Sequence, residues 1–125
     1  MTGVGGVERT LVVFDDIKAE RDRQDAKWGD QSDSRDGTGP GSLPLAGMRP
    51  VESYMGAATL AEKATAQTDR HAQLPGGATM ADILLEEVFE ALAESDPVKL
   101  RTELVQAGAV IVAWCEYLDR RGAKP

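Results

Sequence analysis

The chain has 125 residues, of which 42% are hydrophobic and 28% are charged, and its formal net charge is -7. This length predicts one domain able to bury a core, and the surplus of acid excludes proteins that bind duplex nucleic acid or anionic membranes through a basic surface. Only 5% of the residues are aromatic whereas alanine and leucine are abundant, which favours helices.

The N-terminal part of the chain predicts an arm followed by a helix. Residues 1–14 are expected to form a flexible arm, because the first residues are small and rich in glycine. Residues 11–14 have no later strand to pair with, so they are interpreted as leading into the first helix. That helix is predicted over residues 15–28, with Asp15 or Asp16 near its N-cap.

A long loop and a second helix follow. Gly29 is a suitable C-terminal stop for the first helix. Residues 29–50 are rich in Gly, Ser, Asp and Pro, and a loop of this length is commonly functional. The alanine-rich second helix is predicted over residues 52–71, and the prolyl-glycyl segment 74–77 ends it.

Two more helices complete the predicted fold. Thr79 begins the third helix, and Asp82 three residues later gives a pattern close to a capping box. This helix is expected to end near Ser95. The pair Asp96–Pro97 supplies the N-cap and the first residue of the fourth helix, which is predicted to continue to about Arg121.

The expected fold class is all-α, with four helices forming a bundle over residues 15–121 and a short tail at 122–125. Large apolar residues are scarce, particularly in the second helix, so four helices of this length give a thin core. We therefore expect the chain to oligomerise through its helices, as a homodimer or a homotetramer.

The compartment is expected to be the cytoplasm. The longest apolar run, residues 107–115, contains a glycine and is too short to cross a bilayer. The first residues lack the basic and then apolar pattern of a secretion signal. The one cysteine, Cys115, has no partner for an intramolecular disulfide.

Acidic residues gather on one side of the third helix. On a helical wheel, Glu86, Glu87, Glu90 and Glu94 occupy an arc of about 100°, opposite an apolar arc of about 140°. Such an arc is commonly no more than a solvated helix face, so this helix alone does not establish a site.

An acid also interrupts the apolar stripe of the fourth helix. Glu103 lies within this stripe, which comprises Leu100, Leu104, Ala107, Val110, Ile111, Trp114 and Leu118. Burying a carboxylate costs free energy unless a cation or hydrogen-bond donors compensate it. Two explanations stay open at this point: an ion pair with Arg101 or Lys63, or a metal cation shared with the acids of the third helix.

The ligand types indicate which cation would suit such a cluster. The single histidine, His71, and the single cysteine are not spaced to join it, and His71 is interpreted as a surface or capping residue. Carboxylates without imidazole or thiolate favour Mg²⁺ or Mn²⁺ over Zn²⁺. Because Mg²⁺ also accepts phosphate oxygens as ligands, the pattern indicates metal-assisted phosphate chemistry.

The acidic segments resemble a known signature. Residues 86–90, Glu-Glu-Val-Phe-Glu, followed by residues 103–106, Glu-Leu-Val-Gln, resemble the E-E-x-x-E and E-x-x-D motifs of the MazG-like all-α nucleoside triphosphate pyrophosphohydrolases. Residues 20–29, ERDRQDAKWG, and the tail 103–121 resemble the phage and actinobacterial branch of that family. The resemblance covers most of residues 15–121.

The resemblance implies an activity and a location. The expected reaction is Mg²⁺-dependent, with Mn²⁺ able to substitute, and converts an NTP or dNTP and water to the monophosphate and pyrophosphate. Deoxynucleotides are the favoured substrates, with action on dATP and dGTP or on non-standard dNTPs as specific versions. For a phage-encoded chain the compartment would be the host cytoplasm.

The resemblance also implies roles for individual residues. Glu87, Glu90 and Glu103 would be metal ligands, and Glu86 would be a further ligand or the carboxylate that deprotonates the attacking water. Gln106 stands where the family motif has Asp, and its amide oxygen is a weaker, uncharged ligand. This departure favours an alternative, a non-catalytic helical module with a degenerate metal site that binds nucleotides or partners.

Substrate contacts are expected from the first two helices. Arg21, Lys27 and Lys63 are candidates for contacts to phosphate, with the alternative that each is only a surface cation. Trp28 either packs in the core or forms a wall on which a base stacks. In the second case Gln24 would hydrogen-bond the edge of the base.

Overall fold

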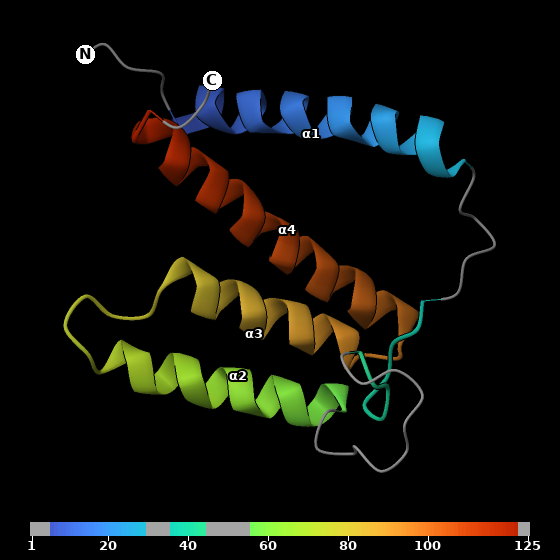
Figure 1. The fold of residues 1–125 in the computed structure, drawn as a ribbon, viewed down its shortest axis with the longest axis vertical. Helices are drawn as coiled ribbons and strands as arrows, with labels where there is room; N and C mark the ends of the chain where they lie inside the picture. The colour runs from blue at the N-terminus through green and yellow to red at the C-terminus, as the bar shows by residue number, and fades with distance from the viewer. Residues whose placement is uncertain (1–5, 30–35, 45–55, 123–125) are drawn as a thin grey trace. The chain divides into compact units, whose positions relative to one another are not determined.

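The computed structural model describes residues 6–29, 36–44 and 56–122. Within these ranges it contains four helices and no strand: α1 (Gly6–Trp28), α2 (Ala57–Ala72), α3 (Met80–Leu92) and α4 (Pro97–Arg120) (Figure 1). The prediction of an all-α chain with four helices is confirmed. None of these helices combines the length and apolar character needed to cross a membrane.

The contacts between Cα atoms divide the chain into two compact units. The first unit comprises Met1–Arg35 and Ile111–Pro125, and the second comprises Asp36–Val110. The helix α4 contributes its C-terminal part to the first unit and its N-terminal part to the second. The two units are therefore described separately.

The helix α1 begins earlier than the sequence predicted. Residues 6–14 are helical instead of belonging to a flexible arm, so Asp15 and Asp16 are not at the N-cap. Contacts within the first unit explain the difference, because Val13 is buried and the Thr10 hydroxyl donates to Glu116 Oε1 at 2.7 Å. Such tertiary contacts outweigh the weak local propensity of this segment.

Both long helices end where the sequence predicted. After α1, Gly29 has a φ of +71°, and its N–H donates to the Asp25 carbonyl at 2.9 Å. At the other end of the chain, α4 ends at Arg120 and is followed by Gly122 with a φ of +78°. Glycine adopts this left-handed conformation without the steric cost of a Cβ atom.

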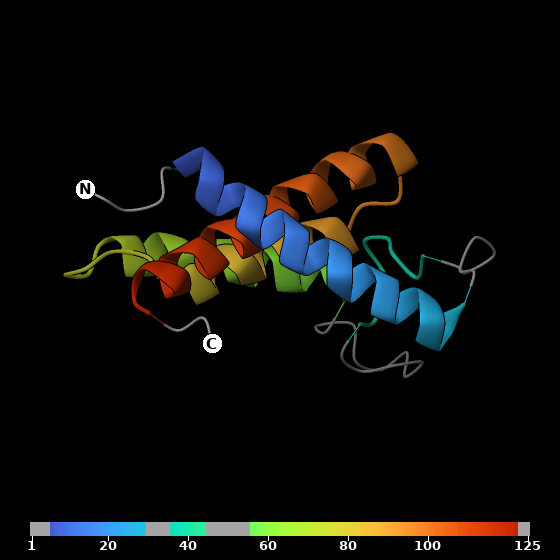
Figure 2. The ribbon, with the colours of Figure 1, turned by 90° about the horizontal axis from the view of Figure 1, so that it is seen from above.

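In the second unit, α2 and α3 lie side by side as a helical hairpin (Figures 1 and 2). The predicted capping box is present: Thr79 Oγ1 accepts from the Asp82 N–H at 3.1 Å, and Asp82 Oδ2 accepts from the Thr79 N–H at 3.0 Å. The helix α2 begins at Ala57 with Gly56 as its N-cap, and residues 52–55 of the predicted helix lie outside the described ranges.

Residues 36–44 of the predicted loop form backbone hydrogen bonds with the end of α3 and the start of α2. The Gly39 N–H donates to the Leu92 carbonyl at 2.9 Å, and the Ala57 N–H donates to the Ser42 carbonyl at 2.8 Å. The segment 36–44 therefore joins the C-terminal end of α3 to the N-terminal end of α2. The Ser42 carbonyl also serves as the acceptor for the first N–H of α2, because the N-cap residue Gly56 has no side chain that could accept it. Residues 30–35 and 45–50 of that predicted loop lie outside the described ranges.

The core within the described ranges is small. Its buried hydrophobic residues are Val13, Ala57, Ala91, Leu100 and Ala107. The prediction of a continuous core stripe along α4 was wrong at three positions, since Leu104, Ile111 and Leu118 are exposed. Apolar side chains on α4 are thus left uncovered by the rest of their own unit.

We expect Thr79→Ala to lower the melting temperature, because it removes the side-chain half of the capping box and leaves the Asp82 N–H without its acceptor. Loss of such a cap costs about 1 kcal/mol. Thr102→Ala, on an exposed interior turn of α4, is the matched control and should melt like the parent protein. Thermal melts followed by circular dichroism measure both, and equal melting temperatures for the two variants would contradict the assigned cap.

Candidate metal centre

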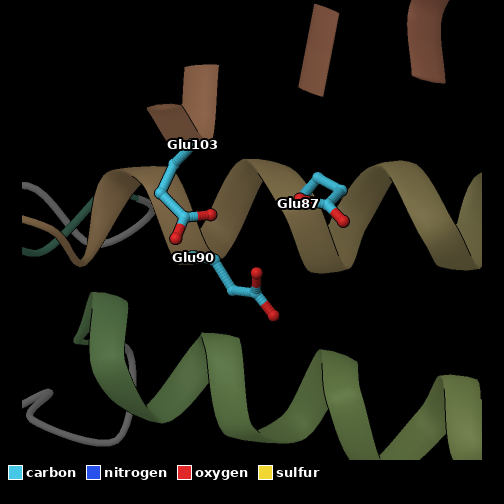
Figure 3. Close-up of side chains that lie close together, drawn as sticks. All are labelled: Glu87, Glu90 and Glu103. Carbon is cyan, nitrogen blue, oxygen red and sulfur yellow. The ribbon is translucent and has the colours of Figure 1, made fainter. Parts of the chain in front are cut away.

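Three carboxylates from two helices converge in the second unit. Glu87 and Glu90 lie on α3 and Glu103 lies on α4, and each offers one carboxylate oxygen such that the three atoms lie within 4.8 Å of one another (Figure 3). Glu103 extends from α4 toward α3, where the side chains of Glu87 and Glu90 leave neighbouring turns of the helix. Oxygen ligands at this spacing suit a shared hard cation.

Helical periodicity explains why these three side chains meet. Glu87 and Glu90 are three residues apart, so they project from neighbouring positions on the same side of α3. On α4, Glu103 follows the buried Leu100 by three residues and precedes the buried Ala107 by four. The prediction that Glu103 lies on the inward face of its helix is confirmed.

Two carboxylate oxygens of this cluster are buried without a hydrogen-bond partner. They are Glu87 Oε2 and Glu103 Oε2. Among the described ion pairs none joins Glu103 to Arg101 or to Lys63, and both of these cations are exposed. A buried acceptor without a partner costs about 1–3 kcal/mol, so the arrangement favours a cation as the missing partner.

The cluster also perturbs the acidity of its own members. Burial raises the pKa of the Glu87 carboxyl above its ordinary value, and the charges of Glu103 and Glu86 raise it further. Burial likewise raises the pKa of Glu90, followed by repulsion from Glu87, Glu103 and Glu86. A bound divalent cation reverses these effects, because it favours the charged carboxylates and displaces their protons.

The other predicted ligands lie at the edge of this cluster. Glu86 is half-buried and outside the group of three, but close enough for its charge to raise the pKa values of Glu87 and Glu90. Gln106 is exposed on α4. Glu94 was placed on the acidic arc of a helix expected to end near Ser95, but α3 ends at Leu92 and Glu94 lies beyond it. Its side chain accepts a hydrogen bond from the backbone N–H of Asp96 at 3.0 Å.

The predicted substrate-binding residues of α1 belong to the first unit and interact with one another. Arg21 donates to Asp25 at 2.7 Å and to Gln24 Oε1 at 3.4 Å, and the Lys27 ammonium lies 4.7 Å from the centroid of the Trp28 ring. Trp28 is 58% exposed, so its indole is available for stacking. Their contact with a substrate stays a prediction.

Sequence reasoning missed one polar network. The carboxylate of Asp82 is only 3% exposed, and it accepts from His71 Nδ1 at 2.7 Å, from Gln67 Nε2 at 2.9 Å and from the Thr79 N–H at 3.0 Å. These bonds, the backbone one first, hold the pKa of Asp82 well below its usual range. His71 is therefore not simply a surface residue.

A signal for this network was present in the sequence. Gln67 and His71 are four residues apart on one face of α2, close to the turn into α3. Because a short connection brings the end of one helix beside the start of the next, both side chains could have been placed next to the N-terminal acid of α3.

Comparison of the chain with protein-family models, with curated proteins and with solved structures found no match. Its function therefore has to be inferred from the chemistry of the site.

We expect divalent cations to stabilise the protein more strongly as the pH rises. The raised pKa values of Glu87 and Glu90 mean that protonation stabilises the metal-free fold below their ordinary value of 4.5, and this contribution is lost as the pH rises through the folded-state values. Cations bind the deprotonated carboxylates. Thermal melts with and without Mg²⁺ should therefore show a larger shift at about pH 8 than at about pH 5.

A matched variant identifies the source of this shift. Glu94→Gln removes an acid that lies just beyond the end of α3 and outside the group of three, so the Mg²⁺-dependent shift should persist in it. A shift of equal size at both pH values, or one that disappears in Glu94→Gln, would contradict the assigned site.

Proposed function

We propose that the chain is a Mg²⁺-dependent nucleoside triphosphate pyrophosphohydrolase that cleaves the α–β phosphoanhydride of a dNTP to give a dNMP and pyrophosphate. One observation carries the proposal: Glu87, Glu90 and Glu103 bring carboxylate oxygens within 4.8 Å of one another, and one oxygen each of Glu87 and Glu103 is buried without a hydrogen-bond partner. The resemblance of these residues to the MazG-like signature supports the same activity.

The donor set fits Mg²⁺, or Mn²⁺ in its place. All three converging ligands are hard carboxylate oxygens, and neither an imidazole nor a thiolate belongs to the group. Glu87, Glu90 and Glu103 would hold the cation. When bound, it would neutralise phosphate oxygens and lower the pKa of a coordinated water.

The remaining chemistry is assigned to the protein's own residues. Glu86 is half-buried next to the ligands and is the candidate general base, which orients a water and accepts its proton. The water oxygen forms a bond to the α-phosphorus while the bond from that phosphorus to the bridging oxygen breaks. Pyrophosphate leaves with the bridging oxygen. Lys63, exposed on α2, is a candidate contact for the phosphate chain.

The second candidate is a non-catalytic module that binds nucleotides or partners. The observation that favours it is Gln106, which replaces the acidic residue of the family motif and is exposed. With Gln in this position the site has less negative charge to hold a second cation, and a degenerate site of this kind binds nucleotide without cleaving it.

A substrate panel separates these candidates. Pyrophosphate release is measured for the standard dNTPs and NTPs with and without Mg²⁺, and binding is measured in parallel by calorimetry. Mg²⁺-dependent release of pyrophosphate supports the enzyme, and nucleotide binding without release supports the module. Absence of both would show that the acids form only a solvated helix face.

We also propose that the active form is a homodimer or a homotetramer. Apolar side chains are exposed in each unit taken by itself: Phe14 on α1 is 50% exposed, and Leu104 on α4 is 54% exposed. Burial of apolar surface contributes about 25 cal/mol per Å². A second copy that covers these side chains would therefore add the stability that the small core of one chain lacks.

Sedimentation at micromolar concentration should accordingly give a mass that is a multiple of 13.4 kDa, twofold or fourfold. Leu104→Glu places a charge on the uncovered face and should shift the population toward monomer. Leu74→Glu, an equally apolar and exposed position in the connection between α2 and α3, is the matched control and should leave the mass unchanged. A fully active monomer would rule out the assembly.

A further inference from the structure

The chain's one histidine presents a free ring nitrogen. An ionised carboxylate only accepts hydrogen bonds, so the 2.7 Å contact between His71 Nδ1 and Asp82 Oδ2 places a hydrogen on Nδ1. The remaining ring nitrogen, Nε2, is left available, and the His71 side chain is 38% exposed. A carboxylate that fixes the orientation of one ring nitrogen is the arrangement by which proteins aim the other at a ligand.

The hairpin does not need this imidazole for its own hydrogen bonds. Without His71, each oxygen of Asp82 still has a donor, Gln67 Nε2 for Oδ1 and the Thr79 N–H for Oδ2. The C-terminal end of α2 is closed by backbone bonds, from the Gln73 N–H to the Arg70 carbonyl and from the Leu74 N–H to the His71 carbonyl. The carboxylate of Asp82 and the C-terminal end of α2 therefore keep hydrogen-bond partners without the side chain of His71.

The imidazole lies at one end of the row of acids on α3. Asp82 precedes Glu86 by one turn on the same face, and at a rise of about 1.5 Å per residue the two are about 6 Å apart along the helix axis, with Glu90 about 12 Å from Asp82. The helix α3 has no lysine or arginine of its own. A phosphate chain held at the carboxylates therefore takes its donors from other helices, and on α2 the imidazole of His71 is held in orientation by its hydrogen bond to Asp82.

We propose that His71 Nε2 donates a hydrogen bond to a phosphate oxygen of the bound nucleotide, with Asp82 as the positioning residue. This inference rests on the proposed function, because it names a contact of the same substrate. Protonated histidine donates from both ring nitrogens, so Nδ1 serves Asp82 while Nε2 serves the phosphate. An imidazole that is neutral before binding takes one proton from solvent at Nε2 when the phosphate chain binds.

The test uses the imidazole signals of the whole 125-residue chain, which come from one residue because the chain has one histidine. Mg²⁺ is added first, then inorganic pyrophosphate and then dATP, while the nitrogen resonances of His71 are recorded by NMR. We expect Nε2 to move toward the imidazolium position with Mg²⁺ and pyrophosphate together, and to stay in place with Mg²⁺ alone. This measurement needs no variant, so it remains decisive where a substitution prevents folding.

A pair of variants adds an affinity measurement. His71→Gln should weaken the binding of Mg²⁺-pyrophosphate about tenfold or more, the effect of losing one hydrogen bond to a charged group. Arg70→Gln, the neighbouring exposed cation on α2, should bind as the parent does. A purely structural role of His71 would lower the melting temperature of His71→Gln and leave its affinity unchanged.

The outcomes separate this inference from the proposed function. Pyrophosphate binding by calorimetry without a shift of Nε2, or with full affinity in His71→Gln, overturns the contact and leaves the enzyme standing. A shift of Nε2 in a protein that releases no pyrophosphate from any nucleotide supports the contact and overturns the hydrolase. A protein that binds neither pyrophosphate nor dATP overturns both.

Discussion

Glu90→Gln and Glu103→Gln should each lower kcat/KM for pyrophosphate release by about a hundredfold or more, while the fold survives. The two side chains come from α3 and α4 and belong to the group of three converging carboxylates (Figure 3). An amide keeps the shape of the side chain but removes the charge that holds a hard cation. Since each factor of ten corresponds to about 1.4 kcal/mol, a hundredfold loss is a modest expectation for a metal ligand.

The same substitutions should raise the melting temperature of the metal-free protein at neutral pH. Burial and mutual repulsion raise the pKa of Glu90, which means that the folded state disfavours its charge. Replacing Glu90 by a neutral residue removes this penalty, so stability and activity should change in opposite directions. A variant that loses activity because it unfolds would instead melt at a lower temperature.

Glu94→Gln is the control for the activity measurement, because Glu94 follows the end of α3 and accepts from the Asp96 N–H instead of joining the group of three. It should keep full activity. Activity like that of the parent in either Glu90→Gln or Glu103→Gln would show that the ligands are elsewhere.

Local signals in the sequence predicted most of the helix boundaries. The capping box at Thr79, the Asp96–Pro97 start of α4 and the glycines after α1 and α4 each act within a few residues, and each was confirmed. The start of α1 was missed because it depends on a contact distant in sequence, between Thr10 and Glu116. Periodicity could not supply that information.

The candidate site was likewise predicted where it depends on spacing within one helix, and missed where it depends on packing between helices. Helical spacing was sufficient to predict that Glu87 lies beside Glu90. The apolar residues one turn before and after Glu103 were sufficient to predict that it lies on the inward face of α4. The wheel did not show that Leu104, one residue later in the same stripe, is exposed, because exposure depends on what packs against the helix. The pairing of His71 with Asp82 was missed for a similar reason, since it depends on how two helix ends meet.

Trp28→Ala should have a large effect on substrate affinity. An indole that is 58% exposed offers a flat apolar surface, and stacking of one base on an aromatic side chain contributes about 1–3 kcal/mol. Its loss should therefore raise KM about tenfold, and it should do so for every substrate, because all bases have a face that stacks. The Lys27 ammonium lies over the ring, 4.7 Å from its centroid, so a base stacking on that face would have to displace it.

Gln24→Ala should have a different effect from Trp28→Ala, because hydrogen bonds to the edge of a base discriminate where stacking does not. Cations bound to phosphate cannot distinguish bases. The difference in kcat/KM between good and poor dNTP substrates should therefore become smaller when the Gln24 amide is removed. The measurement is kcat/KM for each dNTP with the two variants and with Arg23→Ala, an exposed control on the same helix that pairs with Glu20. If neither Trp28→Ala nor Gln24→Ala changes affinity or substrate ranking, α1 is only a scaffold, and the base must be bound by other residues, in the loop that follows α1 or in a neighbouring subunit.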